Sequence, residues 1–202
     1  GAAPIVFPYT FIAESNTGIP SGHDFDNDGQ INNGGNDCYG FGVFPGQYAM
    51  AVLSKLPLDT ANIRTFQKFL WKDMPGNAMP TDYYDAAEQD IFRLSSKSHW
   101  DIPVQVGGQT VHVLCSHPTP PAFDAAPYYW NQKRNHDEIR FWADYVTPGQ
   151  GGYIYDDAGV SGGLGGDQRF VILGDQNADP DEGDSYQNAI NQLLTNVNIN
   201  AS

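Results

Sequence analysis

Two oxygen-bearing side chains follow a hydrophobic segment in the second half of the chain. Residues 169–173 (Arg-Phe-Val-Ile-Leu) end at Gly174, and Asp175 and Asn177 come directly afterwards. Because alternate side chains on an extended backbone point the same way, we expect the carboxylate and the amide to converge at the carboxyl end of a strand. Ligands of α/β sheets usually bind at this end, and hard cations such as Mg²⁺ prefer oxygen ligands. A polar turn that only closes the strand is the alternative interpretation.

A histidine occupies a similar place after another predicted strand. Residues 110–115 alternate in polarity, Ser116 and His117 follow, and Pro118 favours an extended conformation for His117. A histidine, an aspartate and an asparagine at strand ends can bind a phosphate ester, hold a metal ion and orient water. We therefore predict that His117 meets the pair at 175 and 177 at one edge of a sheet. A purely structural histidine is the alternative.

The elements that would position these residues form a mixed α/β pattern. Two alternating runs, 102–106 and 110–115, flank a Gly-Gly pair and predict a β-hairpin. Residues 134–145 predict an amphipathic helix, and residues 169–174 predict a further strand. Residues 59–72 fit a helix and a strand equally well. Weaker signals predict a strand at 48–53, a helix from a Thr81 cap to Phe92, and a last helix capped by Asp184 or Ser185.

Composition indicates a single acidic domain over residues 1–202. The hydrophobic fraction of 40% supports a core, and no apolar run is long enough to cross a membrane. The formal net charge of −14 would repel nucleic acid, which is therefore a disfavoured but not excluded partner. Few lysines and many Gly, Asn and Asp residues favour a secreted or periplasmic protein. Cys38 and Cys115 allow at most one disulfide, and the sequence leaves its formation open.

A second acidic cluster lies nearer the N-terminus. Asp24, Asp26 and Asp28 alternate and a glycine follows, as in the first half of an EF-hand calcium loop. The backbone carbonyl of Gln30 would add a ligand, and Asp37 would replace the closing glutamate, which is missing here. Carboxylates this close repel one another unless a cation neutralises them. This repulsion favours a structural Ca²⁺ site over a plain acidic surface loop.

Several motifs together resemble the endonuclease/exonuclease/phosphatase superfamily, in a secreted bacterial branch that is deoxyribonuclease- and sphingomyelinase-like. The similarity runs through nearly the whole chain. It implies an α/β fold with two mixed β-sheets packed face to face and outer helices, a four-layer sandwich that is incomplete here. The motifs are Ser116-His117, Gly-Asp-Gln-Asn-Ala-Asp at 174–179, Leu-Ser-x-x-Pro at 53–57, Ser-Ser-Lys-Ser-His-Trp-Asp at 95–101 and the predicted helix from Arg134.

The resemblance implies hydrolysis of phosphate esters by in-line attack of water. It implies that His117 contacts the scissile phosphate, that Asp175 positions or deprotonates the water, and that Asn177 binds phosphate or a metal. Asp175 and Asn177 would then hold a catalytic divalent ion, Mg²⁺ or Mn²⁺, or else Ca²⁺. Arg134 and His99 are further candidates for substrate binding, since one could reach a phosphate and the other could line a cleft.

The resemblance also implies residues that residues 1–202 do not supply. These are an asparagine and a metal-binding glutamate on the first two strands, and an Asp-His pair on the last strand. We therefore expect this chain to be the central portion of such a domain, a phosphoesterase when flanking segments or other chains complete its site. The alternative from another class is a non-catalytic, calcium-stabilised extracellular module that assembles with other chains.

Overall fold

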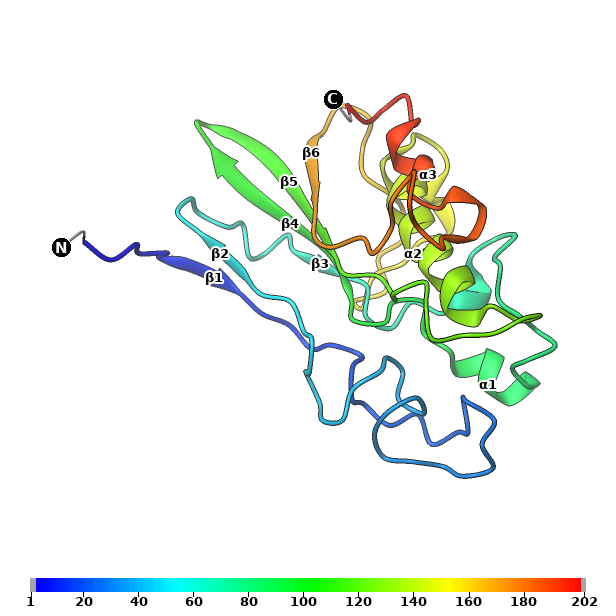
Figure 1. The fold of residues 1–202 in the computed structure, drawn as a ribbon. Helices are drawn as coiled ribbons and strands as arrows, with labels where there is room; N and C mark the ends of the chain where they lie inside the picture. Colours follow the sequence, from blue (N-terminus) through cyan, green and yellow to red (C-terminus); the bar gives the residue numbers. More distant parts are fainter. Residues whose placement is uncertain (1–2, 201–202) are drawn as a thin grey trace.

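Residues 3–200, the part of the chain that the computed structural model describes, contain two β-sheets and several helices joined by long irregular segments (Figure 1). The smaller sheet pairs β1 with β2 in antiparallel orientation. The larger sheet has the order β3-β4-β5-β6, and it is mixed because only β5 and β6 run parallel. The predicted α/β fold with two sheets is thus confirmed. The strands are β1 (Tyr9–Phe11), β2 (Val52–Ser54), β3 (Arg64–Thr65), β4 (His99–Val106), β5 (Gln109–Ser116) and β6 (Arg169–Leu173).

The helices lie on the side of the large sheet that is turned away from β1 and β2 (Figure 1). The longest, α2, runs beside this sheet, and α3 packs against α2. The layers described in residues 3–200 are therefore small sheet, large sheet and helices, where the resemblance implied a further outer helical layer. The α-helices are α1 (Ala86–Ile91), α2 (Trp130–Val146) and α3 (Asn191–Leu194), and the 3-10 helices are η1 (Trp71–Asp73), η2 (Gly151–Tyr153) and η3 (Tyr186–Asn188).

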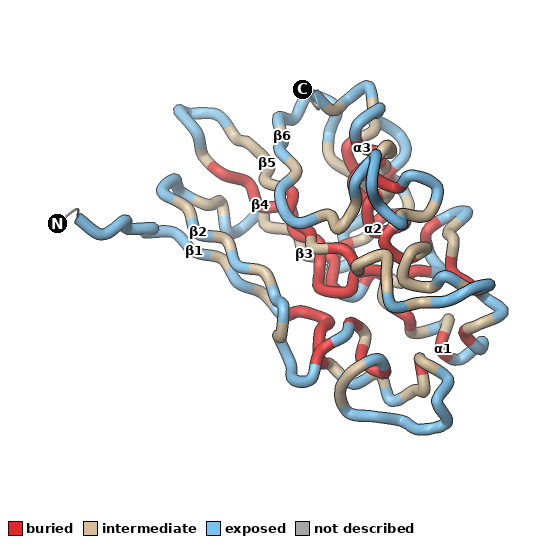
Figure 2. Tube along the Cα trace, viewed as in Figure 1, coloured by how far each residue is buried: buried red, intermediate tan, exposed pale blue. Residues whose placement is uncertain are grey.

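Two cores lie on opposite faces of the large sheet. On β4, Trp100, Ile102 and Val104 are buried towards the small sheet, where Cys115 of β5 joins them. On the other face, Leu114 belongs to the larger core beneath α2. This alternation follows from the two-residue period of a strand. Figure 2 shows the buried part of β4 as a continuous segment between the exposed hairpin tip and the centre of the molecule.

The larger core is mainly aromatic. Phe66 lies edge-on to Phe141, with ring centroids 5.1 Å apart, and Trp142 and Tyr145 of α2 complete the group. All four side chains are at most 1% exposed. Burial of each such ring stabilises the fold by about 3 kcal/mol, so this face fixes the position of α2 on the sheet.

Local structure confirms some of the expected elements and corrects others. The hairpin is present, with Val106 paired to Gln109 across the Gly-Gly turn. The predicted cap at Thr81 is wrong, because Asp85 caps α1 in a reciprocal capping box with Glu88. Ser185, one of the two predicted caps of the last helix, is the N-cap residue of the 3-10 helix η3, and the last α-helix begins only at Asn191. Both cysteines are free thiols.

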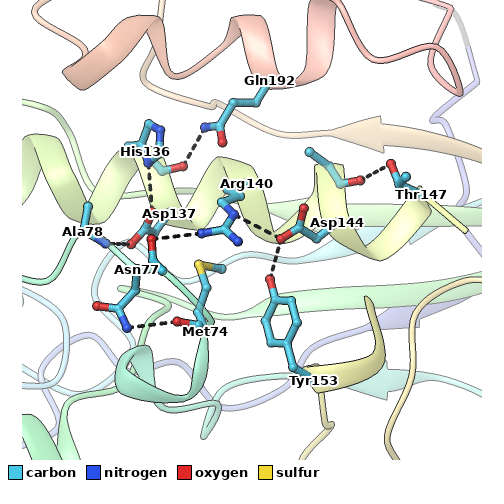
Figure 3. A network of polar contacts seen from close by, with 12 residues as sticks. Met74, Asn77, Ala78, His136, Asp137, Arg140, Asp144, Thr147, Tyr153 and Gln192 are labelled. Atoms are coloured by element: carbon cyan, nitrogen blue, oxygen red, sulfur yellow. Dashed lines mark hydrogen bonds and ion pairs between the residues drawn. The ribbon is translucent and has the colours of Figure 1, made fainter. Parts of the chain in front are cut away.

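Polar contacts tie α2 to neighbouring segments (Figure 3). The buried carboxylate of Asp137 accepts hydrogen bonds from the backbone N–H of Ala78 and the indole N–H of Trp71, both at 2.6 Å. Gln192 of α3 donates to the backbone carbonyl of His136 at 2.9 Å. The helix is therefore anchored by hydrogen bonds as well as by its aromatic face.

Candidate active site

The two predicted site segments leave neighbouring strands at the same level. In the parallel β5–β6 pair, Cys115 is in register with Leu173, so the chain beyond each strand starts side by side. Gly174 has a φ of +132° and lies against Ser116 so closely that an added Cβ would be 1.9 Å from the carbonyl oxygen. A side chain at this position would separate the two segments, so the close approach requires glycine.

Hydrogen bonds join the two segments beyond the strands. The side-chain amide of Asn177 donates to the carbonyl of Pro118 at 3.1 Å. Asn135, which is fully buried on α2, donates to the carbonyls of Thr119 and Gln176 at 2.8 and 3.0 Å. One helix residue thus bridges both segments, and the segments that carry His117 and Asp175 are held together.

His117 and Asp175 line the same cavity, of about 440 Å³, between β2 and the ends of β5 and β6. Asp175 is exposed, and its Oδ1 accepts the backbone N–H of Asn177 at 2.9 Å. The rest of the lining is largely apolar and includes Met50, Val52, Cys115 and Leu173. A few polar groups at the wall of a largely apolar cavity are typical of a small-molecule site.

The electrostatic environment favours the neutral form of His117. Burial and the positive charge of Lys97 lower the pKa of His117 below its ordinary value, and the charges of Asp175 and Glu138 oppose this only in part. A neutral imidazole can donate one hydrogen bond and accept one. It therefore suits contact with a phosphoryl oxygen without a fixed positive charge of its own.

Oxygen ligands for a divalent ion remain available next to this cavity. Within residues 3–200, the second carboxylate oxygen of Asp175 has no hydrogen-bond partner, and Asn177 uses only its NH₂ group in the bond to Pro118. One carboxylate with one amide oxygen fits Mg²⁺ or Mn²⁺, which keep water and substrate phosphate in their other positions. The donor set is therefore compatible with the predicted catalytic ion.

Two residues that the sequence suggested for substrate binding have structural contacts instead. The guanidinium of Arg134 is buried and donates to the carbonyls of Leu94, Tyr39 and Arg93. His99 is 1% exposed, and its Nε2 donates to the carbonyl of Glu138 at 2.9 Å. Neither residue lines the cavity beside His117 and Asp175.

Sequence reasoning missed Glu138, which lies behind the site. Its two carboxylate oxygens accept the backbone N–H groups of Ser96 and Thr119, both at 2.6 Å, and the side chain is 1% exposed. It therefore clamps the segment before β4 to the segment after β5. A signal was present, because residues 135, 138, 142 and 145 share one helix face, and the polar members of that face point to contacts with buried backbone.

The acidic loop brings three of its predicted ligands together. Asp24, Asp26 and Asp28 each offer a carboxylate oxygen, and these atoms lie within 4.8 Å of one another. Asp24 also accepts the backbone N–H of Asp28 and Gly29. Within the described residues, Oδ1 of Asp26 is buried and has no hydrogen-bond partner. A buried carboxylate oxygen without a donor fits a site that holds a cation.

The remaining predicted calcium ligands are placed differently. Both oxygens of Asp37 accept backbone N–H groups, from Phe25 and Asn32 at 2.8 Å, and the residue is buried. Asp37 therefore braces the loop and does not join the three-aspartate cluster. The N–H of Gln30 donates to Asp28 at 2.8 Å, which keeps Gln30 beside the cluster.

Comparison with known families identifies the class of protein. Residues 10–201 match the model of the Endonuclease/Exonuclease/phosphatase family, and the chain belongs to this family. The family hydrolyses phosphate esters or phosphodiesters, including nucleic acids, and typically depends on divalent metal ions. Searches of curated proteins and of solved structures found no match. No helix within residues 3–200 is long and apolar enough to span a membrane.

Proposed function

We propose that this protein is a metal-dependent phosphoesterase whose site lies in the cavity beside His117 and Asp175. The observation that carries the proposal is the joining of these two residues at the ends of parallel neighbouring strands. Family membership supplies the reaction class. The ends of β5 and β6 supply a histidine, a carboxylate and an amide, which can contact a phosphate ester, hold a metal ion and orient water.

Each residue has a role that its environment supports. The neutral imidazole of His117 donates a hydrogen bond to a phosphoryl oxygen. The carboxylate of Asp175, which Asn177 orients through its backbone N–H, accepts a proton from the attacking water. Asp175 and the amide oxygen of Asn177 would hold Mg²⁺ or Mn²⁺, and such an ion, when bound, neutralises charge on the phosphate.

Small phosphate esters suit the site better than long nucleic acids do. The chain carries a formal charge of −14, which repels a polyanion over its whole length but affects a small ester much less. A bound cation would reverse the sign of the local potential at the site. We place the protein outside the cytoplasm, in keeping with its acidic, lysine-poor composition.

Hydrolysis of chromogenic esters tests this proposal. Bis-p-nitrophenyl phosphate and p-nitrophenyl phosphate would be assayed with Mg²⁺, Mn²⁺ or Ca²⁺, and plasmid DNA would be assayed in parallel. We expect turnover that needs metal and falls at least 100-fold in His117→Ala and Asp175→Ala, because each removes a member of an interdependent group. Asp82→Asn, which makes a similar change at an exposed aspartate, serves as the control. Equal rates in wild type and both site variants would refute the assignment.

We also propose that Asp24, Asp26 and Asp28 hold a structural Ca²⁺ ion. The unpartnered buried oxygen of Asp26 supports this, because its desolvation has no other compensation among the described residues. The same loop favours the second candidate function, a calcium-stabilised extracellular module without catalysis that assembles with other chains. Stabilisation by Ca²⁺ in a protein that hydrolyses none of the esters would support the module over the enzyme.

A further inference from the structure

Lys97 is a buried cation. The residue is 5% exposed, and among the described residues its ammonium group has one hydrogen-bond acceptor, the carbonyl of Pro118 at 3.2 Å. Within residues 3–200, no carboxylate oxygen lies within ion-pair distance of its Nζ. Buried lysines are costly unless a negative charge compensates them. This lysine therefore lacks the compensation that a purely structural role would require.

Glu138, the carboxylate with the strongest electrostatic effect on Lys97, does not form an ion pair with it. Glu138 interacts with Lys97 through space, but each of its oxygens accepts a backbone N–H, from Ser96 and Thr119. These two N–H groups flank Lys97 and Pro118 in the chain. Glu138 thus holds the lysine and its acceptor in place without forming an ion pair with the ammonium group.

The position of Lys97 connects it to the candidate site. The carbonyl of Pro118 accepts hydrogen bonds from both Lys97 and Asn177. The charge of Lys97 acts on His117, and that of Asp175 acts on Lys97, so the ammonium lies within electrostatic reach of both cavity residues. Burial lowers the pKa of Lys97 to about 8, and it remains mostly protonated at neutral pH. Lys97 does not itself line the cavity.

We propose that Lys97 is a positioning residue that supplies, from behind His117 and Pro118, the positive charge that attracts a phosphate group into the cavity. The proposal rests on the proposed phosphoesterase function and names the source of its anion selectivity. In a low-dielectric interior, a fixed charge acts over a longer distance than it would in water. The bound phosphate provides the negative charge that the buried ammonium lacks in the free protein.

Two substitutions separate the charge of Lys97 from its hydrogen bond. Lys97→Met removes both, whereas Lys97→Gln removes the charge and keeps an uncharged N–H donor. If the charge matters, we expect both variants to lower kcat/KM for the phosphate esters by about 10- to 100-fold, the range for groups that support a site from its outer shell. Lys68→Gln, at an exposed lysine, removes the same charge from the surface and should leave the rate within about twofold. Full activity in Lys97→Gln with loss only in Lys97→Met would overturn the charge proposal.

NMR of Lys97 in the wild-type protein tests the same proposal without substitutions, in case the variants do not fold. Inorganic phosphate would be titrated into ¹⁵N-lysine-labelled protein, and the ε-ammonium resonances would be followed by NMR. We expect the Lys97 resonance to shift and that of Lys68 to stay constant. An unmoved Lys97 resonance at saturating phosphate would refute the proposal. If phosphate shifts Lys97 but no ester is hydrolysed, the proposed catalysis fails while the anion-attracting role stands.

Discussion

Replacement of Glu138 by glutamine should destabilise the protein strongly although it changes only one atom. Both carboxylate oxygens accept buried backbone N–H groups at 2.6 Å, from Ser96 and Thr119. In Glu138→Gln one oxygen becomes an NH₂ group, so one backbone N–H faces a second donor. A lost charge-assisted hydrogen bond with a buried unsatisfied donor costs about 3 kcal/mol. The neighbouring Lys97 would lose a favourable charge as well, which acts in the same direction.

Urea unfolding monitored by tryptophan fluorescence measures this cost. With a denaturant dependence of about 3 kcal/mol/M, the midpoint should fall by about 1 M. Glu182→Gln makes the same change at an exposed glutamate and should leave the midpoint within about 0.2 M. A Glu138→Gln midpoint equal to that of Glu182→Gln would show that the carboxylate does not clamp the two segments, and the reasoning on Lys97 would lose its geometric basis.

Three further predictions concern other parts of the molecule. Gly174→Ala should lower the free energy of unfolding, measured in urea, by about 3 kcal/mol or more, because its Cβ would meet the Ser116 carbonyl. Gly76→Ala, at a φ of +63° with open space around it, should lower it by only about 1 kcal/mol. Equal losses would refute the steric argument. Burial, opposed by the charge and the backbone carbonyl of Glu138, lowers the pKa of His99 from 6.5 to about 4. The folded state therefore disfavours protonation, and stability present above pH 6.5 is lost as the pH falls towards 4, by about 2 kcal/mol at pH 5. His99→Gln should flatten this dependence between pH 7 and 5, and an unchanged slope would contradict the assignment. Ca²⁺ at 100 times its Kd should raise the free energy of unfolding of the wild type and of Asp82→Asn by about 2.7 kcal/mol relative to EDTA. The increase for Asp26→Asn should be much smaller. No response in the wild type would exclude the calcium site.

The sequence predicted those parts of the site that depend on the pattern of polar and hydrophobic residues along the strands. Alternation in 102–106 and 110–115 predicted the hairpin, and the hydrophobic run before Gly174 predicted β6. Strand ends that carry polar residues predicted a shared edge, and His117 and Asp175 do line one cavity. Their chemical roles remain predictions, because lining the same cavity does not establish which step of a reaction each residue performs.

Other features depend on partners that are distant in the sequence. The sequence makes Arg134 a candidate for substrate binding, yet its acceptors are carbonyls of residues 39, 93 and 94, which only the folded chain brings to it. His99 is similar, because its burial against α2 decides its role. The cap of α1 is different, because Asp85 and Glu88 have the spacing of a capping box and this signal is local in the sequence.

The parallel ladder between β5 and β6 determines which changes in chain length the site can tolerate. The last part of the crossover from β5 to β6, residues 147–168 after α2, can gain or lose residues without altering which residues of the two strands pair. One residue inserted within β6 would instead carry Asp175 forward by about 3.3 Å and turn its side chain to the opposite face. Among natural relatives, length differences should therefore gather in the crossover, while the count from Arg169 to Asp175 stays constant.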